Sequence, residues 1–180
     1  FVCFARRWAF RSREQLVSTQ RYLLKGGQIL GGKSADLLIT DGRITEISAS
    51  ISEKEATVID LKGSIVLPGL VDLHTHLREP GREDSETVAS ASRAGAKGGF
   101  TALSAMANTS PVADTAGVVE QVYRLGQEAG FADVFPIGAV TQGLHGEQLS
   151  EIGAMADSVA RVRVFSDDGN CVFDPLVMRR

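Results

Sequence analysis

The sequence has few cysteines and histidines, no long apolar run and no excess of basic residues, and each scarcity excludes a class of protein. Two cysteines among 180 residues, Cys3 and Cys171, do not make a disulfide framework, so we expect a reducing compartment and a cytoplasmic location. No apolar run approaches the ~20 residues of a membrane span, so we expect no membrane partner. The formal net charge of −3 gives no indication of a nucleic-acid partner. The composition of the whole sequence, 43% hydrophobic and 23% charged, is that of an ordinary globular protein.

The charge is distributed unevenly, with a basic N-terminal segment. Residues 1–21 contain five arginines and one glutamate, a net charge of +4, so residues 22–180 carry −7. An Arg-rich, acid-poor start is typical of organelle transit peptides, and a disordered or misassigned leader is the alternative, since the sequence begins with Phe1 rather than Met. We leave residues 1–20 as an unassigned basic leader and expect them to be disordered.

Residues 21–66 have the pattern of a small β domain. Short runs of Leu, Ile and Val are separated by Gly-Gly pairs at 26–27 and 31–32 and by Asp-Gly at 41–42. Asp-Gly between two alternating apolar runs is a strong signal for a β-hairpin. We therefore predict an antiparallel β unit here, forming a small β-sandwich domain.

From residue 67 onward, apolar runs alternate with segments of helical spacing. The four predicted strands read "GLVDLHTH", "FTALSAMAN", "DVFPIGAV" and "ARVRVFSDDG". The helices that follow them have predicted N-caps at Ser85, Asp114 and Asp174 and predicted stops at Gly98–Gly99 and Gly130. Strict alternation predicts an α/β fold with a parallel sheet and crossover helices. Four βα units in residues 67–180 would form half of a (β/α)8 TIM barrel. The alternative, an open doubly wound sheet, usually has a Gly-rich phosphate loop where this sequence has His-Thr-His.

Two of the three histidines, His74 and His76, stand at the end of the first of these strands. In an extended segment residues i and i+2 point the same way, so both imidazoles can reach one metal ion, and imidazole suits Zn²⁺. The alternative is that the His-Thr-His pattern arises by chance, or that both histidines are structural or simply exposed. Asp72 could orient a ligand or be a plain surface residue.

Other polar residues follow the ends of the other predicted strands, the face where barrel enzymes place their sites. Asp168 is the third metal ligand that we predict, while Asp167 is interpreted as a turn residue. Arg78 presents a planar fork suited to a substrate carboxylate, unless it pairs with a neighbouring glutamate. Asn108 could bind the same group, although a turn residue is the alternative; His145 is interpreted as a surface residue.

Together, "PGLVDLHTHLREPG", "GGFTALSAMANTSPVADT", "PIGAVTQGL" and "FSDDGNCVFDP" resemble the type I dihydroorotases of the amidohydrolase superfamily, from about residue 22 to residue 180. The resemblance implies a metal-dependent (β/α)8 barrel beside a small β domain, and the reversible cyclisation of N-carbamoyl-L-aspartate to L-dihydroorotate in pyrimidine (UMP) biosynthesis. It implies that His74 and His76 are zinc ligands and that Asp168 joins two zinc ions. It further implies that Arg78, Asn108 and His76 contact the substrate.

Two departures from the family's pattern qualify this interpretation. Ala107 stands where the family usually has proline, so we expect Asn108 to be placed less rigidly. The family takes two further zinc-binding histidines and a proton-shuttling aspartate from later strands, and we expect all three beyond Arg180. We therefore expect no catalytic residue within this chain and no activity of the chain alone. The full-length protein is expected to be a homo-oligomer.

Two other functions stay open. One is a non-catalytic dihydroorotase-like partner of aspartate transcarbamoylase, against which the retained residues His74, His76 and Asp168 argue. The other is a related cyclic amidase, an allantoinase or hydantoinase. Those enzymes typically join their metals through a carbamylated lysine, and "ARVRVFSDDG" contains no lysine.

Overall fold

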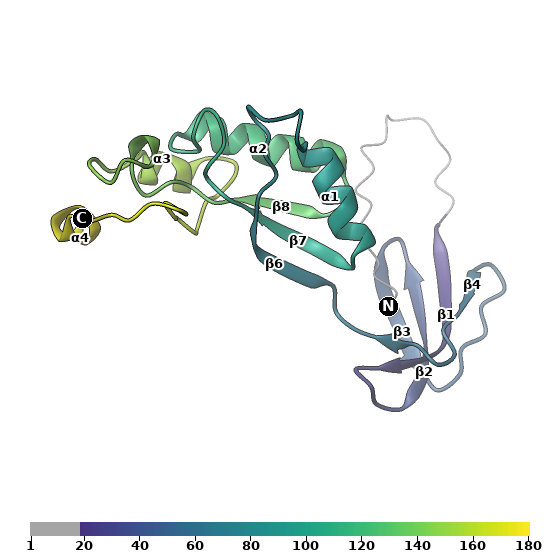
Figure 1. The fold of residues 1–180 in the computed structure, drawn as a ribbon. Helices are drawn as coiled ribbons and strands as arrows, with labels where there is room; N and C mark the ends of the chain where they lie inside the picture. Colours follow the sequence, from purple (N-terminus) through teal and green to yellow (C-terminus); the bar gives the residue numbers. More distant parts are fainter. Residues whose placement is uncertain (1–18) are drawn as a thin grey trace. The chain divides into compact units, whose positions relative to one another are not determined.

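The computed structural model describes residues 19–180 and divides between Gly69 and Leu70 into two compact units (Figure 1). The basic leader predicted for residues 1–20, and Cys3 within it, therefore lie outside the described residues apart from the leader's last two positions. Cys171 is an exposed free thiol. Within residues 19–180, no helix combines the length and apolar character needed to cross a membrane.

The first unit is built around one mixed five-stranded sheet. Its strands are β1 (Arg21–Ile29), β2 (Ser34–Thr40), β3 (Arg43–Ser48), β4 (Thr57–Asp60) and β5 (Ile65–Val66). The main order is β3-β2-β1-β4, with β1–β2 and β2–β3 antiparallel and both β4 and β5 parallel to β1. The predicted antiparallel unit is thus wrong for the last two strands, because their direction depends on crossover segments that residue alternation does not record. A second sheet that would make a sandwich is not among residues 19–69.

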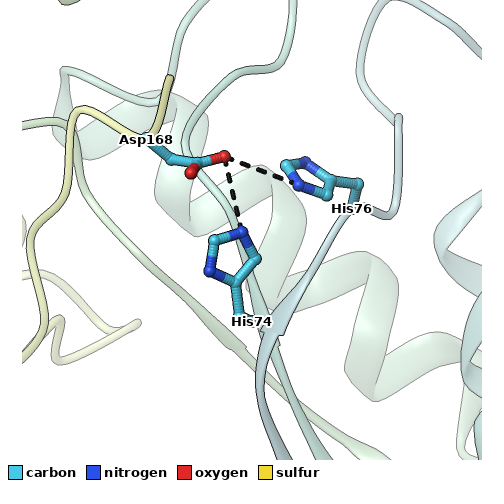
Figure 2. Close-up of side chains that lie close together, drawn as sticks. All are labelled: His74, His76 and Asp168. Atoms are coloured by element: carbon cyan, nitrogen blue, oxygen red, sulfur yellow. Dashed lines mark ion pairs between the residues drawn. The ribbon is translucent and has the colours of Figure 1, made fainter. Parts of the chain in front are cut away.

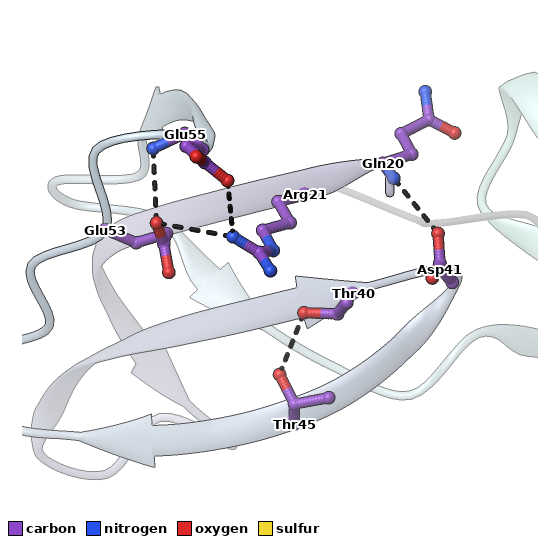
Figure 3. A network of polar contacts seen from close by, with 7 residues as sticks. All are labelled: Gln20, Arg21, Thr40, Asp41, Thr45, Glu53 and Glu55. Atoms are coloured by element: carbon purple, nitrogen blue, oxygen red, sulfur yellow. Dashed lines mark hydrogen bonds and ion pairs between the residues drawn. The ribbon is translucent and has the colours of Figure 1, made fainter. Parts of the chain in front are cut away.

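The predicted hairpin at Asp41 and Gly42 is confirmed. These two residues link β2 to β3, Thr40 pairs with Arg43 across the turn, and the φ angles of 49° and 77° are those of a two-residue hairpin turn. Figure 3 shows the polar contacts around this end of the sheet, where the amide of Gln20 donates to the Asp41 carboxylate at 3.0 Å. The turn is therefore fixed both by its own backbone and by the start of β1.

A buried carboxylate, Asp36 on β2, ties this unit together. It is 4% exposed and accepts hydrogen bonds from the amides of Ile51 (3.0 Å) and Gly26 (2.9 Å), with the Lys25 ammonium 3.8 Å away. The Ile51 bond lowers the pKa of Asp36, burial opposes that shift, and the Gly26 bond and Lys25 add to the lowering. The net result is a carboxylate that stays charged inside the unit.

Asp36→Asn should reduce the free energy of unfolding at pH 7 by about 1–3 kcal/mol, because an amide cannot accept both bonds equally. Since the pKa is lowered in the folded chain, the carboxylate's contribution is present above its ordinary value of 3.8 and is lost as pH falls through the folded pKa. Urea unfolding at pH 7 and pH 3 measures this, with exposed Asp60→Asn as the control. An equal deficit at both pH values would contradict the prediction.

The second unit is a parallel α/β layer, as the alternation of strands and helices predicted. Strands β6 (Leu70–Thr75), β7 (Phe100–Ala105) and β8 (Asp133–Pro136) pair in that order. Helices α1 (Val88–Lys97) and α2 (Ala116–Ala129) cover one face of this sheet (Figure 1). The short helices η1 (Gln142–Leu144), α3 (Ile152–Asp157) and α4 (Pro175–Arg179) follow. The predicted fourth strand is reduced in the described chain to one parallel bridge between Gly138 and Phe165.

The helix ends agree with the predictions at their C-termini more than at their N-termini. Gly98 and Gly130 end α1 and α2 as predicted, and Asp174 caps α4. The predicted N-caps at Ser85 and Asp114 are wrong. Thr87 caps α1 through a capping box with Ser90, and Thr115 precedes α2, while the Asp114 carboxylate accepts a hydrogen bond from the distant amide of Gly143.

Gly126 lets α2 lie close to β8. A Cβ at this position would lie 2.5 Å from Cβ of Val134, whereas a Cβ at Gly117 in the same helix meets nothing within 4 Å. We expect Gly126→Ala to lower the free energy of unfolding by about 1–3 kcal/mol through overpacking. Gly117→Ala should raise it by up to about 1 kcal/mol, because alanine is the better helix former. Chemical denaturation of both variants measures the contrast, which would vanish if α2 did not pack on β8 here.

Candidate metal centre

His74 lies near the end of β6 and His76 directly follows the strand, and a β-bulge sets the direction of both. Between the pairs Asp72↔Leu103 and Thr75↔Ala105, β6 contains two residues and β7 contains one. Leu103 and Ala105 belong to the core cluster between the sheet and the helices. Thr75 pairs with Ala105, so its side chain points to the same, helix-covered face. His74 and His76, on either side of Thr75, therefore point to the opposite face. The amide of His74 donates to the Asp72 carboxylate at 3.0 Å, which steadies the bulge.

Three of the predicted site residues converge (Figure 2). Nε2 of His74 lies 3.4 Å from Oδ2 of Asp168, and Nε2 of His76 lies 3.5 Å from the same oxygen. The two imidazole rings have centroids 5.3 Å apart and meet edge to face at 63°. The His74 side chain is 55% exposed and those of His76 and Asp168 are 29% and 28% exposed, so the cluster opens to solvent on one side. Residues nearly a hundred positions apart thus present three donor atoms to one point.

The donor set fits a zinc-type cation. Two imidazole nitrogens and one carboxylate oxygen lie within 4.8 Å of one another, and these are the ligand types that Zn²⁺ prefers. The 3.4 and 3.5 Å separations are longer than a charge-assisted hydrogen bond of about 2.7–2.9 Å. Ligand atoms about 2.0–2.1 Å from one tetrahedral zinc lie about 3.3–3.4 Å apart, close to the 3.4 and 3.5 Å distances from the two histidine nitrogens to Asp168.

The predicted binding residue Asn108 contacts His76. Its Oδ1 lies 2.9 Å from Nδ1 of His76. With Nδ1 as the donor in this bond, the lone pair of Nε2 points to Asp168, the tautomer that a metal ligand needs. Ala107, which stands where the family usually has proline, is 1% exposed, and its carbonyl accepts from the amide of Ala113 at 3.0 Å. The less rigid placement of Asn108 stays a prediction.

Arg78 lies two residues past the cluster in a loop, with a φ of 63°. Within residues 19–180, no ion pair or hydrogen bond engages its guanidinium. The pairing with Glu79 or Glu83 that the sequence left open is not formed. Those carboxylates accept from the amides of Val88 and Gly81, each at 2.8 Å. The guanidinium is therefore available to a ligand.

Sequence reasoning interpreted Asp167 as a turn residue and missed the burial of its side chain, because a turn-like segment gives no sign of burial. Asp167 is 6% exposed and accepts hydrogen bonds from the amides of Val140 (2.7 Å) and Thr141 (3.1 Å) and from the Thr141 hydroxyl. Nothing in "FSDDG" distinguishes a buried aspartate from an exposed one. His145 is exposed, as predicted, and lies outside the cluster.

Arg180, beyond which we expect the proton-shuttling aspartate and the further histidines, is not itself a site residue. It is exposed, it follows the last turn of α4, and its amide donates to the carbonyl of Val177 at 3.3 Å. The metal-ligating cluster found among residues 19–180 does not include it. The aspartate and histidines expected beyond Arg180 stay a prediction.

Parallel strands with crossover helices, and a His-His-Asp cluster at their carboxyl ends, define an α/β protein of the amidohydrolase superfamily type. Solved structures agree. L-hydantoinase (dihydropyrimidinase) from Arthrobacter aurescens is similar over 71% of this chain and 29% of its own, with 25% identity and a TM-score of 0.58. An adenine deaminase is similar over 68% of this chain and 31% of its own, with 25% identity and a TM-score of 0.50.

The family model described as "Dihydro-orotase-like" matches residues 63–175, and the chain belongs to this family. The dihydroorotase of Leifsonia xyli subsp. xyli is 63% identical over 164 residues, which are 91% of this chain and 37% of that protein. The dihydroorotase of Streptomyces coelicolor is 61% identical over 159 residues, 88% of this chain and 37% of that protein. The chain therefore spans somewhat over a third of the length of these curated relatives.

Proposed function

We propose that this chain is the N-terminal part of a zinc-dependent dihydroorotase, which interconverts N-carbamoyl-L-aspartate and L-dihydroorotate. The convergence of His74, His76 and Asp168 in a chain of the dihydro-orotase-like family carries this proposal. Ring closure forms a C–N bond between the carbamoyl nitrogen and the side-chain carboxyl carbon and releases water. The reverse reaction hydrolyses that amide bond. The relatives named dihydroorotase support the substrate assignment.

His74, His76 and Asp168 would hold the metal, at the strand ends of what we propose is half of a (β/α)8 barrel. When bound, Zn²⁺ lowers the pKa of water and polarises a carbonyl oxygen. Asn108 would keep His76 in its ligating tautomer through the 2.9 Å contact. We propose two zinc ions in the complete site, with the remaining ligands and the proton-shuttling aspartate supplied by parts of the protein beyond Arg180.

Arg78 would bind the carboxylate of the substrate. Its guanidinium has no described partner, and its planar fork can donate two parallel hydrogen bonds to a carboxylate. Asn108 and His76 would border the same substrate group, as the family resemblance implies. A homo-oligomer, and an association with aspartate transcarbamoylase, belong to this proposal for the whole protein.

A cyclic amidase acting on hydantoins is the second candidate, because a hydantoinase structure matches this fold. Two features of the sequence favour dihydroorotase over it. Residues 160–169 contain no lysine that carbamylation could turn into a metal bridge, and Asp168 takes that place. Arg78 favours a substrate that bears a carboxylate, which hydantoin and allantoin do not offer.

The test is to express the longest open reading frame that contains this sequence and to assay it with Zn²⁺ on L-dihydroorotate, hydantoin and allantoin. We expect dihydroorotate to be hydrolysed at least about 100-fold faster than either of the others, and Arg78→Lys to reduce that preference. Faster hydrolysis of hydantoin or allantoin would transfer the proposal to the second candidate. No turnover of any of the three would overturn both.

A further inference from the structure

We propose that Asp167 is a positioning residue that aims its neighbour Asp168 at His74 and His76. The inference rests on the metal site of the proposed function and deepens it. Asp167 itself does not approach the cluster; it acts through the backbone that it shares with Asp168 and through the loop at residues 140–146.

The backbone that carries Asp168 has little sheet to hold it. The predicted fourth strand is reduced to one bridge, in which Gly138 donates to Val164 at 3.1 Å and accepts from Ser166 at 2.9 Å. A regular strand would continue this ladder toward Asp168. Here the backbone hydrogen bonds to the neighbouring strand end at Ser166, two residues before the carboxylate that faces the histidines.

Where the backbone hydrogen bonds end at Ser166, the side chain of Asp167 makes the next bonds to the neighbouring segment. It is 6% exposed, and it accepts the amides of Val140 at 2.7 Å and Thr141 at 3.1 Å, together with the hydroxyl of Thr141. Its own carbonyl accepts the amide of Asn170 at 2.7 Å, which closes the turn after Asp168. Asp168 is therefore held on both sides by bonds to Asp167.

Thr141 extends this link into the loop. Its side chain is fully buried, and its hydroxyl donates to Asp167 while accepting the amide of Gly146 at 2.9 Å. Three donors thus converge on one buried carboxylate that has no cation beside it among the described residues. Anchoring Asp167 fixes the first residue of the turn that contains Asp168, and so fixes the backbone from which the Asp168 side chain reaches the histidines.

The charge of Asp167 matters as much as its shape. An asparagine has nearly the same volume, but its NH₂ group would face donors that already crowd this position. Asp167→Asn should therefore displace the backbone at Asp168 and weaken Co²⁺ binding, in the protein expressed from the longest open reading frame that contains this sequence, by about 10- to 100-fold, the effect typical of residues that orient metal ligands. Thr141→Val should weaken binding in the same direction, and Thr141→Ser, which keeps the hydroxyl, should restore it.

A matched control is Ser158→Ala. Ser158 is 8% exposed and donates to the carbonyl of Met155 at 2.7 Å, so its loss removes a buried hydrogen bond away from the site. We expect this variant to lower thermal stability without changing the Co²⁺ affinity or the visible absorption spectrum of the bound ion. A purely structural role for Asp167 would give the same result in Asp167→Asn.

The experiment titrates Co²⁺ into each variant by absorption spectroscopy and measures amide hydrogen exchange at Val140 and Thr141 in the metal-free chain. Weaker Co²⁺ binding and at least about tenfold faster exchange in Asp167→Asn and Thr141→Val would support the inference. Unchanged binding by a variant that remains folded would overturn it and leave the metal site standing. If the unsubstituted protein binds no Co²⁺, the metal site of the proposed function fails. In that case, hydrogen exchange still tests whether Asp167 anchors the loop. Unchanged exchange rates at the amides of Val140 and Thr141 in Asp167→Asn would overturn that role.

Discussion

Replacing His74, His76 or Asp168 by alanine is expected to lower the affinity of the chain for Zn²⁺ or Co²⁺ by at least about 100-fold. Residues that merely orient a ligand typically cost 10- to 100-fold, and these three side chains supply the donor atoms themselves. The expectation follows from the convergence of both Nε2 atoms on one carboxylate oxygen at 3.4 and 3.5 Å. Losing any one donor leaves two of the three that the described residues supply.

Titration with Co²⁺ followed by absorption spectroscopy, and isothermal calorimetry with Zn²⁺, measure this loss. His145→Ala is the matched control, because it removes the third histidine of the sequence from an exposed position outside the cluster. Its affinity should equal that of the unsubstituted chain. If removing His145 weakened binding as much as removing His74, the metal would be held by exposed histidines in general and not by this cluster.

Gly81→Ala should lower the free energy of unfolding by about 2–4 kcal/mol, or force two loops apart. Gly81 has a φ of 100°, and a Cβ there would lie 2.1 Å from the carbonyl oxygen of Ser110. The amide of Ser110 in turn donates to the carbonyl of Pro80 at 2.9 Å. A backbone atom cannot move aside as a flexible side chain can, so the close approach of these two loops depends on the missing side chain.

The same two loops carry Arg78 and Asn108, so the substitution should also disturb the contact between Asn108 and His76. Urea denaturation measures the stability, and the NMR signals of the His76 ring report the contact. Gly169→Ala separates the causes: its φ of 85° is equally unfavourable for alanine, but its Cβ would meet nothing within 4 Å. Equal losses in both variants would mean that backbone conformation alone, and not loop contact, is responsible.

Local patterns in the sequence were sufficient for the features that depend on near neighbours. Asp41–Gly42 predicted its hairpin, Gly130 its helix end, and the spacing of His74 and His76 their shared direction, because each depends on residues a few positions apart. The place of Asp168 after a predicted strand made it the third predicted ligand, the family resemblance implied the same role, and the structure brings its side chain to both histidines.

Features that depend on distant partners were not predicted. Asp114 has the residue type of an N-cap, but a bond to Gly143 engages its carboxylate. Asp167 was interpreted as a turn residue, and nothing in "FSDDG" indicated that its side chain is buried against Val140 and Thr141. The bulge in β6 depends on the register with β7, which no residue of β6 specifies alone.

The mixed sheet of the first unit implies an order in which it assembles. The hairpin of β2 and β3 closes through two residues, an event of about 1–10 μs, whereas the parallel pairing of Gln28 with Ile65 must wait for a long loop to close. Asp36 belongs to the early stage, because Gly26 lies on the neighbouring strand β1 and Ile51 lies three residues past Ser48, the partner of Asp36 on β3. Both of its hydrogen bonds depend on short loops and not on the return of β5 to β1, so this buried carboxylate is engaged before the sheet is complete.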